Sequence, residues 1–528
     1  MNNIKIFVAD DVNEDKLAPL REAGFNVVKK TKLEGDALAA EIRDADGVIV
    51  RSATRITADL MDAAEKLRVI GRAGVGVDNI DVKAATARGI VVMNAPDGNT
   101  ITTAEHTIAL LVSMARNIPQ AHAKLQTGVW DKKSFVGVEL HGKTLGVVGL
   151  GRIGKHVAGI ARGFGMNILA FDPFASTEQA GELGIELGTL DEVLSKADFV
   201  TIHTPVTDET RGIIGRDAFA KMKTGVRLVN CARGGLVDEA ALLEAVESGK
   251  VAAAAMDVFA QEPLPADSPL LGNDKIITTP HLGASTTEAQ EGVALTVAEQ
   301  MRDYLADGTL RGAVNAPSMA AKELEAFQPY IDLAEKLGRF QAQIMNEHPV
   351  ASVKIEYAGE LAEKDAAPVT RAFLAGLLKD VSARVNVVNA LHIADERGIN
   401  ITTSYTQTKR SPFDIRTAVA SAQSEQTASG MVFANGEGRI TEIGNFSIEA
   451  VPSGFMLLTK NRDVPGVIGQ IGTLLGEAEV NISRFYLGRE AKGGEALAVI
   501  EIDSPLEEKV LTDLRNLEAV NVARQVRL

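Results

Sequence analysis

The chain has 528 residues, of which 45% are apolar and 24% charged, with a formal net charge of −15 at pH 7 and one cysteine, Cys231. This length exceeds what one hydrophobic core usually organises, so we expect on the order of three or four domains. The acidic total argues against a nucleic-acid-binding protein. A single cysteine excludes an internal disulfide and a cysteine-cluster metal site, and it suits a reducing compartment.

The N-terminal run 4–10 is strand-like, so we expect no signal peptide there. No uninterrupted apolar stretch approaches the length that crosses a membrane. We therefore expect a soluble, cytoplasmic protein with no membrane partner.

The first hundred residues alternate strand-like and amphipathic segments, which predicts a parallel sheet with helical crossovers. Residues 102–116 are apolar on most faces and are expected to form either a buried helix or a subunit interface. The strand-like segments are 4–10, 25–30, 46–52 and 67–74.

A second alternating stretch follows, and its strands and helices match a doubly wound nucleotide-binding domain. Six strands are expected, within residues 143–151, 166–173, 197–205, 225–235, 252–259 and 275–283.

The character of the sequence changes at residues 311–318, where we expect a domain boundary. Residues 322–454 carry no motif with recognisable chemistry; 369–381 is expected to be helical, and the polar stretch 421–430 to be a loop. The last 75 residues predict the order βαββαβ, which is ferredoxin-like. Its segments are 454–461, 465–478, 480–488, 496–503, 506–517 and 520–528.

Three glycines with the spacing G-x-G-x-x-G directly follow the first strand of the second stretch and open a helix. Gly149 would make the tight turn, Gly151 would let the backbone approach a pyrophosphate, and Gly154 would let the helix pack on the strand. The next strand ends at Asp172, where a carboxylate would accept hydrogen bonds from ribose hydroxyls and repel a 2′-phosphate. Pro173 follows rather than an arginine, so NAD is favoured over NADP.

Three further residues supply acid–base and anion-binding chemistry. Arg233 follows a predicted buried strand and can grip a carboxylate through two parallel hydrogen bonds. Glu262 and His281 form a potential pair, in which the carboxylate fixes the imidazole tautomer and makes its other nitrogen a better base. Cys231 and His203 are expected to be structural, and no metal ligand set is predicted.

Several motifs in this order resemble the D-isomer-specific 2-hydroxyacid dehydrogenases, and the D-3-phosphoglycerate dehydrogenase family in particular. The resemblance covers the whole chain. It implies NAD-dependent oxidation of 3-phospho-D-glycerate to 3-phosphohydroxypyruvate, the first step of L-serine biosynthesis, with 2-oxoglutarate reduction as a side activity of some relatives. The motifs lie at 149–154, 203–205, 230–239, 254–259 and 280–285, and the more specific ones at 51–81 and 93–107.

The resemblance also implies the architecture: a Rossmann-type NAD domain, a flavodoxin-like substrate domain, an α+β intervening domain and a ferredoxin-like ACT domain. The expected bounds are 1–97 with 283–315 for the substrate domain, 98–282 for the NAD domain, 318–452 for the intervening domain and 454–528 for the ACT domain.

By the same resemblance Arg233, Glu262 and His281 are catalytic. Arg152 and Ile153 would lie beside the pyrophosphate and Asp172 at the ribose, while Asp257 would lie at the nicotinamide end. The residues expected at NAD are Val75, Gly149, Gly151, Arg152, Ile153, Gly154, Asp172, Thr204, Cys231, Ala232, Arg233, Asp257, His281, Leu282, Gly283 and Ala284.

The substrate phosphate needs cations, and the resemblance assigns Arg51 and Arg72, which both end predicted strands. The backbone of Gly74 and Val75 would complete the substrate site together with Arg233. Asn99 and Thr100, at the start of the next helix, are further candidates for substrate contact.

The C-terminal unit resembles an ACT domain, where Asp463 and Asn481 would bind an amino-acid effector, expected to be L-serine. The alternative is that this unit only assembles subunits; a homodimer or homotetramer is expected. Two other functions remain open: a different D-2-hydroxyacid dehydrogenase, or an NAD-sensing corepressor that binds partner proteins.

Overall fold

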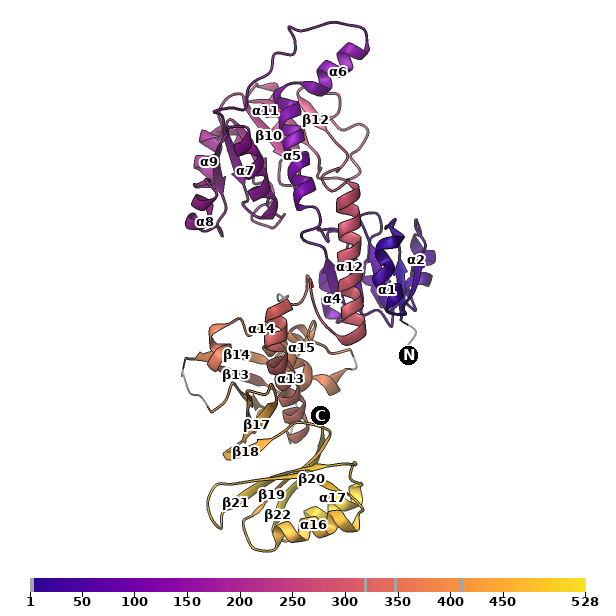
Figure 1. The fold of residues 1–528 in the computed structure, drawn as a ribbon, viewed down its shortest axis with the longest axis vertical. Helices are drawn as coiled ribbons and strands as arrows, with labels where there is room; N and C mark the ends of the chain where they lie inside the picture. Colours follow the sequence, from indigo (N-terminus) through magenta and orange to yellow (C-terminus); the bar gives the residue numbers. More distant parts are fainter. Residues whose placement is uncertain (1–3, 318–320, 346–348, 383, 408–411) are drawn as a thin grey trace.

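The structure is a computed structural model, and it describes residues 4–317, 321–345, 349–382, 384–407 and 412–528. The molecule is elongated, with the two N-terminal sheets at one end and the small C-terminal sheet at the other (Figure 1). Within those residues, no helix combines the length and apolar character needed to cross a membrane.

The first sheet is parallel, with strand order β2-β1-β3-β4-β5, which is the flavodoxin-like arrangement. This confirms the expected fold and adds one strand, β5, which the sequence pattern did not single out. Its elements are β1 (Lys5–Val8), η1 (Glu14–Leu17), α1 (Ala18–Glu22), β2 (Asn26–Lys29), α2 (Gly35–Ile42), β3 (Gly47–Val50), α3 (Ala58–Asp62), β4 (Val69–Arg72), α4 (Val82–Ala87) and β5 (Val91–Asn94).

Helix α12 (Thr287–Asp307) covers one face of this sheet, although it follows the second sheet in the chain. Gly71 lies directly beneath it, where a Cβ would come within 2.5 Å of both Met301 and Val297. The missing side chain therefore lets the helix approach the sheet closely. The N-terminus of α12 is capped by Thr286, whose hydroxyl accepts a hydrogen bond from the Ala289 amide.

The second sheet is parallel, with the order β12-β11-β10-β9-β6-β7-β8. This is a doubly wound nucleotide-binding sheet, as predicted. All six expected strands are present; the seventh, β8, has two residues at the edge and is too short to give a sequence pattern. The strands are β6 (Thr144–Val148), β7 (Asn167–Phe171), β8 (Glu186–Leu187), β9 (Phe199–Ile202), β10 (Val226–Asn230), β11 (Val251–Met256) and β12 (Ile276–Thr278).

The predicted apolar helix is α5 (Thr100–Ala115), and it packs on α7 and on the strands β10 and β11. Most of its apolar residues are buried within one chain, which confirms the buried-helix interpretation. The other helices are α6 (Ile118–Gln126), α7 (Arg152–Gly163), α8 (Thr177–Glu182), α9 (Leu190–Lys196), α10 (Arg216–Lys221) and α11 (Glu239–Glu247).

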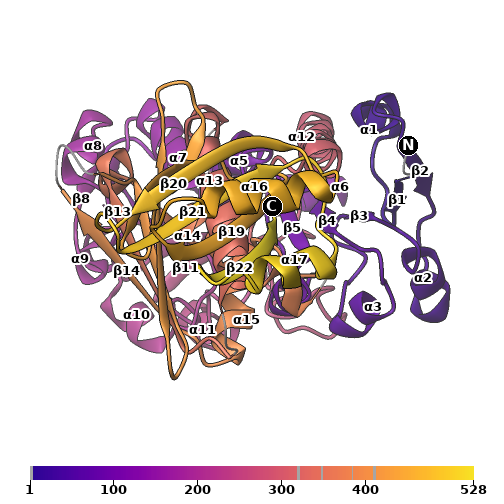
Figure 2. The same cartoon turned by 90° about the horizontal axis from the view of Figure 1, so that it is seen from below.

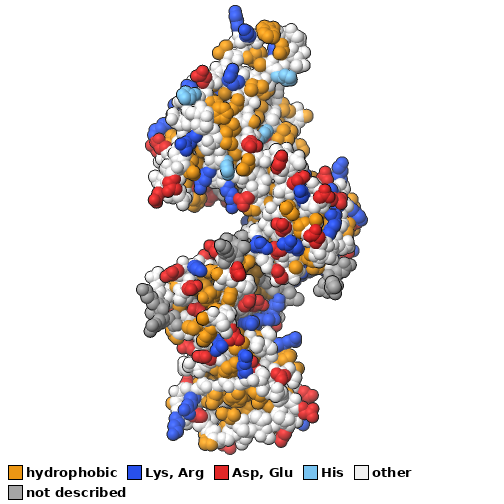
Figure 3. Space-filling view, in the orientation of Figure 1, with side chains coloured by type: hydrophobic (Ala, Val, Ile, Leu, Met, Phe, Trp, Pro, Cys, Tyr) orange, Lys and Arg blue, Asp and Glu red, His pale blue; other side chains and the backbone are white. Residues whose placement is uncertain are grey.

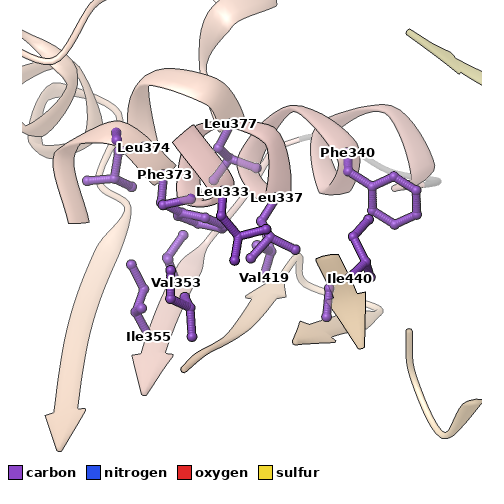
Figure 4. Close-up of a cluster of buried hydrophobic side chains, with 14 of the residues drawn as sticks. Leu333, Leu337, Phe340, Val353, Ile355, Phe373, Leu374, Leu377, Val419 and Ile440 are labelled. Atoms are coloured by element: carbon purple, nitrogen blue, oxygen red, sulfur yellow. The ribbon is translucent and has the colours of Figure 1, made fainter. Parts of the chain in front are cut away.

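The third unit is a mixed sheet with the order β14-β13-β15-β16-β17-β18, packed under α13 (Ala321–Ile344) and α14 (Ala367–Leu377). Figure 4 shows leucine and phenylalanine side chains of both helices pointing at the sheet. The remaining elements are β13 (Ser352–Ala358), η2 (Gly359–Glu363), η3 (Lys379–Val381), α15 (Ala390–Glu396), β14 (Asn400–Thr406), β15 (Ile415–Ala420), β16 (Glu425–Val432), β17 (Gly438–Ile443) and β18 (Phe446–Ala450).

The loop expected at 421–430 is wrong beyond its first four residues, because strand β16 begins at Glu425. Its polar side chains are tolerated because the strand is only partly buried and pairs with both β15 and β17.

Helix α14 confirms the helical prediction for 369–381. The last residue of the predicted boundary at 311–318, Ser318, lies outside the described residues.

The C-terminal unit has the predicted βαββαβ order and an antiparallel sheet, β20-β21-β19-β22. Helices α16 and α17 lie side by side on one face of it (Figures 1 and 2). The ferredoxin-like prediction is therefore confirmed. The elements are β19 (Phe455–Arg462), α16 (Val467–Glu477), β20 (Ile482–Arg489), β21 (Glu495–Ile502), α17 (Glu508–Arg515) and β22 (Val520–Arg527).

Candidate active site

A cleft of about 1020 Å³ lies between the two N-terminal sheets. Both sheets are parallel, so the carboxyl ends of their strands bring polar side chains to this cleft. Its lining combines cations from the first sheet with the predicted acid–base pair from the second. Among the predicted site residues it brings together are Arg51, Arg72, Gly74, Asn99, Glu262, His281 and Ala284.

The glycine turn after β6 has the geometry that the spacing predicts. Gly149 has φ 95°, and a Cβ there would meet the His203 carbonyl carbon at 2.8 Å. A Cβ at Gly154 would lie 2.2 Å from the Gly149 oxygen, so only glycine allows the helix to start this close to the strand. A Cβ at Gly151 would have nothing within 4 Å, which leaves its backbone open to a ligand.

Asp172 stands at the end of β7 and is held by two backbone amides. Its Oδ2 accepts from Leu150 N and its Oδ1 from Phe174 N, both at 2.8 Å. Thr204 Oγ1 is buried and has no hydrogen-bond partner in the part of the chain that the structure describes. An open glycine turn, an anchored acid and an unsatisfied hydroxyl suit the pyrophosphate and ribose of NAD.

Most of the other predicted cofactor residues lie around the second sheet, and Val75 lies on the first. Ile153 is in the first turn of α7, and Arg152 Nε forms an ion pair with Asp97 at 2.8 Å. Cys231 and Ala232 directly follow β10. Val75 lies in the loop after β4, on the first sheet. Leu282, Gly283 and Ala284 lie in the loop before α12.

His281 and Glu262 form the pair that the sequence predicts. His281 Nδ1 lies 2.7 Å from Glu262 Oε2, and the Phe259 amide donates to Glu262 Oε1 at 3.0 Å. Burial alone would raise the pKa of Glu262, but these hydrogen bonds outweigh it and the pKa lies below its usual value. An ionised carboxylate only accepts, so Nδ1 carries a proton, and Nε2 is the nitrogen left to exchange a proton with a ligand.

Asp257, directly after β11, is fully buried and accepts hydrogen bonds from the loop that carries His281. Leu282 N and Gly283 N each donate to it at 2.8 Å. His106 Nε2 lies 3.2 Å from its Oδ1. The sequence analysis did not predict a role for His106. Its spacing of three residues from Thr103 places both on the same side of α5, and Thr103 donates to the Gly283 oxygen there.

Arg233 follows β10 and is partly buried. Its Nη1 donates to the Ala232 oxygen at 2.7 Å, and its Nε lies 3.3 Å from Asp78 Oδ2, across the cleft. Asp78 was not singled out from the sequence, because the segment around it carried only the family resemblance.

Arg51 and Arg72 end strands of the first sheet, as predicted. Arg51 Nη1 donates to the Asp11 oxygen at 2.9 Å. Burial, and after it the charge of Arg233, lowers the pKa of Arg72 to about 10, and Arg72 Nε has no partner among the described residues. A Cβ at Gly74 would fall 1.3 Å from Arg72 Nη1, so the guanidinium lies against the glycine backbone.

Asn99 precedes α5 and Thr100 begins it, at the crossing between the two sheets. Asn99 Oδ1 and Thr100 Oγ1 are buried without a partner in the described part of the chain, which leaves both able to receive a hydrogen bond.

The two structural predictions agree with the geometry. His203 Nε2 pairs with Thr201 Oγ1 at 3.0 Å, and complete burial lowers the pKa of His203 to about 3, so it stays neutral. Burial raises the pKa of the Cys231 thiol to about 12.

The effector candidates lie in the C-terminal unit with separate partners. Asp463 Oδ2 accepts from Gly493 N at 3.1 Å and lies 3.3 Å from Arg489 Nη1. Asn481 Nδ2 donates to Asp503 Oδ2 at 2.7 Å. No hydrogen bond joins Asp463 to Asn481 among the described residues.

Three family models match the chain: the NAD-binding domain of D-isomer specific 2-hydroxyacid dehydrogenases at residues 108–283, the D-3-phosphoglycerate dehydrogenase intervening domain at 326–444, and the ACT domain at 455–519. The D-3-phosphoglycerate dehydrogenase of Bacillus subtilis is 43% identical over 517 residues, which is 97% of each chain. That of Methanocaldococcus jannaschii is 44% identical over 97% of this chain and 98% of its own.

Among solved structures, a glyoxylate reductase from Paecilomyes thermophila is 32% identical with a TM-score of 0.54, covering 60% of this chain and 99% of its own. That protein matches only part of this chain, whereas the D-3-phosphoglycerate dehydrogenases match nearly all of it. The chain therefore belongs to the D-3-phosphoglycerate dehydrogenase family, within the NAD-dependent D-isomer-specific 2-hydroxyacid dehydrogenases.

Proposed function

We propose that this protein oxidises 3-phospho-D-glycerate to 3-phosphohydroxypyruvate with NAD, as the first step of L-serine biosynthesis. The observation that carries the proposal is the contact of 2.7 Å between His281 Nδ1 and Glu262 Oε2, in a cleft that also holds Arg51 and Arg72. An acid–base pair beside several cations suits a 2-hydroxy acid that carries a phosphate. The names of the full-length relatives give the same substrate.

In the proposed mechanism, NAD bound at the glycine turn supplies the hydride acceptor. His281 Nε2 would remove the proton of the C2 hydroxyl while the C2 hydrogen leaves as a hydride, with its bonding electron pair. Glu262 holds the Nδ1 proton and stabilises the imidazolium that forms, and such acid–base assistance is typically worth about 10²–10⁴-fold in rate. In reverse, protonated His281 acts as the acid toward a 2-keto group.

Substrate binding would divide between the two sheets. Arg233 would hold the substrate carboxylate and draw electron density from C2. Arg51 and Arg72 would hold the phosphate, and the backbone of Gly74 and Val75 would complete the site. This division supports a preference for a phosphorylated acid, since a smaller substrate would leave the two arginines without an anionic ligand.

The cofactor roles are proposed in the same way. Asp172 would accept from the adenosine ribose hydroxyls, and the amides of Arg152 and Ile153 would contact the pyrophosphate. The Thr204 hydroxyl would donate a hydrogen bond to the cofactor. The Asp257 carboxylate would accept one at the nicotinamide end. We propose the same domain bounds as the sequence predicts. The substrate domain would comprise residues 1–97 and 283–315, the NAD domain 98–282, the intervening domain 318–452 and the ACT domain 454–528.

We also propose assembly into a homodimer or homotetramer. Exposed apolar side chains on α6 and in the following loop support it: Trp130 is 78% and Val136 79% exposed. Figure 3 shows apolar atoms gathered at this tip of the molecule.

L-Serine is the proposed effector of the ACT domain, at Asp463 and Asn481. The free, buried Cys231 supports a place in the reducing cytoplasm.

The test follows NADH formation by the purified chain with NAD and 3-phosphoglycerate, with D-glycerate in parallel and with L-serine added. Turnover restricted to the phosphorylated acid is expected. Equal rates on both acids would favour a general D-2-hydroxyacid dehydrogenase. No turnover in either direction, with NADH still bound, would favour a corepressor.

A further inference from the structure

We infer that Asp78 is a positioning residue, whose carboxylate orients the Arg233 guanidinium for the substrate carboxylate. The inference rests on the proposed function, because it assumes that Arg233 binds substrate. Asp78 follows β4 of the substrate sheet, and Arg233 follows β10 of the cofactor sheet. The contact therefore crosses the cleft, with Arg233 Nε 3.3 Å from Asp78 Oδ2.

The guanidinium has one hydrogen bond and one ion-pair contact, at two of its three nitrogens. Nη1 donates to the Ala232 oxygen at 2.7 Å, from the same side of the cleft, while Nε faces Asp78 on the other. The hydrogen bond restrains the plane of the guanidinium, and the charge of Asp78 favours the orientation that keeps Nε beside it, so the remaining donors have a preferred direction. A substrate carboxylate then meets donors that are already oriented.

Gly76 shows how closely this pair is packed. A Cβ at that position would lie 2.2 Å from Arg233 Nη2 and 2.8 Å from Asp78 Oδ2. The backbone of this loop therefore bounds both side chains on one side, and Arg233 cannot turn further toward Gly76. The loop thus limits where the guanidinium can lie and also supplies the carboxylate that pairs with it.

The negative charge of Asp78 also reduces the repulsion between Arg72 and Arg233. Burial lowers the pKa of Arg72 most, the Arg233 charge lowers it further, and the Asp78 charge raises it again. Asp78 thus offsets the repulsion between the two arginines that the proposal assigns to opposite ends of the substrate. Without it, Arg233 would be expected to turn away from Arg72 toward water.

Stability does not account for this ion pair. The Asp78 side chain is 79% exposed and that of Arg233 31%, and ion pairs in contact with water contribute little to folding. The contact between the exposed Asp78 carboxylate and Arg233 on the other sheet is better explained as a means of orienting the Arg233 guanidinium.

The experiment is steady-state kinetics of the full chain carrying Asp78→Asn, which keeps the shape and removes the charge. The control is Asp62→Asn, an aspartate at the end of helix α3 beside the same sheet, which pairs with Arg88 and does not line the cleft. We expect the KM for 3-phosphoglycerate to rise about tenfold in Asp78→Asn, as for the loss of one charge-assisted contact, with the KM for NAD and the Tm unchanged. An unchanged KM for the acid would overturn the inference. A lowered KM would overturn it too, because Asp78 would then compete with substrate for Arg233.

Two further variants separate orientation from other effects. Gly76→Ala displaces the guanidinium without changing any charge, and it should raise the same KM. In an Arg233→Ala background, Asp78→Asn should add nothing; a full additional effect would show that Asp78 does not act through Arg233. If Arg233→Ala itself leaves the kinetics unchanged, the proposed role of Arg233 fails. If Arg233→Ala is impaired and Asp78→Asn is not, only the role of Asp78 fails.

Discussion

Asp257 Oδ1 lies 3.2 Å from His106 Nε2, and this contact joins the end of β11 to helix α5 beside the cleft. The same carboxylate accepts from Thr279 Oγ1 at 2.6 Å and from the amides of Leu282 and Gly283 at 2.8 Å. A buried carboxylate with this many donors fixes the loop on either side of His281. The proposed base is thereby held by the backbone as well as by Glu262.

Asp257→Asn should lower the stability at pH 7 by about 1–3 kcal/mol, since it leaves buried donors poorly matched. Burial alone would raise the pKa of Asp257, but hydrogen bonds from His106, Thr279 and Leu282 place it below 3.8. A carboxyl with a pKa depressed by folding contributes stability above its unfolded pKa and loses it as pH falls through the folded pKa. The Tm deficit of the variant is therefore complete at pH 7 and shrinks below about pH 4. Thermal melts from pH 3 to 7 test this; a constant deficit would contradict it.

His281→Asn should reduce kcat by about 10²–10⁴-fold while NADH still binds. Asparagine is the suitable replacement because His281 has φ 54°, in the left-handed region that asparagine tolerates better than alanine. The measurement is kcat with both substrates saturating, beside an NADH titration by fluorescence. Near-normal turnover would remove His281 from the mechanism.

Much of this site could be predicted because local sequence determines it. The turn at Gly149 and the acid at Asp172 are fixed by strand, glycine spacing and helix in succession. Glu262 and His281 were predicted because their residue types suit one reaction. Their contact of 2.7 Å was a hypothesis until the fold brought the two loops together.

The missed features depend on tertiary contacts that leave no local pattern. His106 lies within an apolar helix, and its partner Asp257 is 151 residues away. Asp78 meets Arg233 only when two sheets face each other. Strand β16 was expected to be a loop because polarity was weighed more heavily than pairing with neighbouring strands, which the sequence alone does not reveal.

Asp172→Asn should shift the cofactor preference toward NADP. The amide keeps a similar shape, so the hydrogen bond from Leu150 N can persist, but the negative charge that repels a 2′-phosphate is lost. We expect the ratio of kcat/KM for NAD to that for NADP to fall by roughly tenfold or more, as expected for the loss of one charge-dependent interaction. An unchanged ratio would assign the preference to other residues.

Cys231 should resist thiol reagents in the folded protein. The thiol is buried and its pKa is about 12, so almost no thiolate exists at pH 8. Titration with a disulfide reagent should find no reactive thiol until denaturant is added, and then one per chain. Rapid labelling of the native protein, with loss of activity, would contradict the structural role.

Arg51→Gln tests the proposed phosphate site. Arg51 lines the cleft and Arg55 is exposed on the following loop, so Arg55→Gln is a matched control that removes the same charge four residues away. Loss of a charge-assisted contact to phosphate should raise the KM for 3-phosphoglycerate roughly ten- to a hundredfold. Any slow turnover of D-glycerate, which lacks the phosphate, should be unaffected. Equal losses on both acids would instead indicate that Arg51 maintains the structure of the cleft. Equal losses in Arg51→Gln and Arg55→Gln would indicate that total positive charge near the cleft, and not a contact of Arg51, sets the KM.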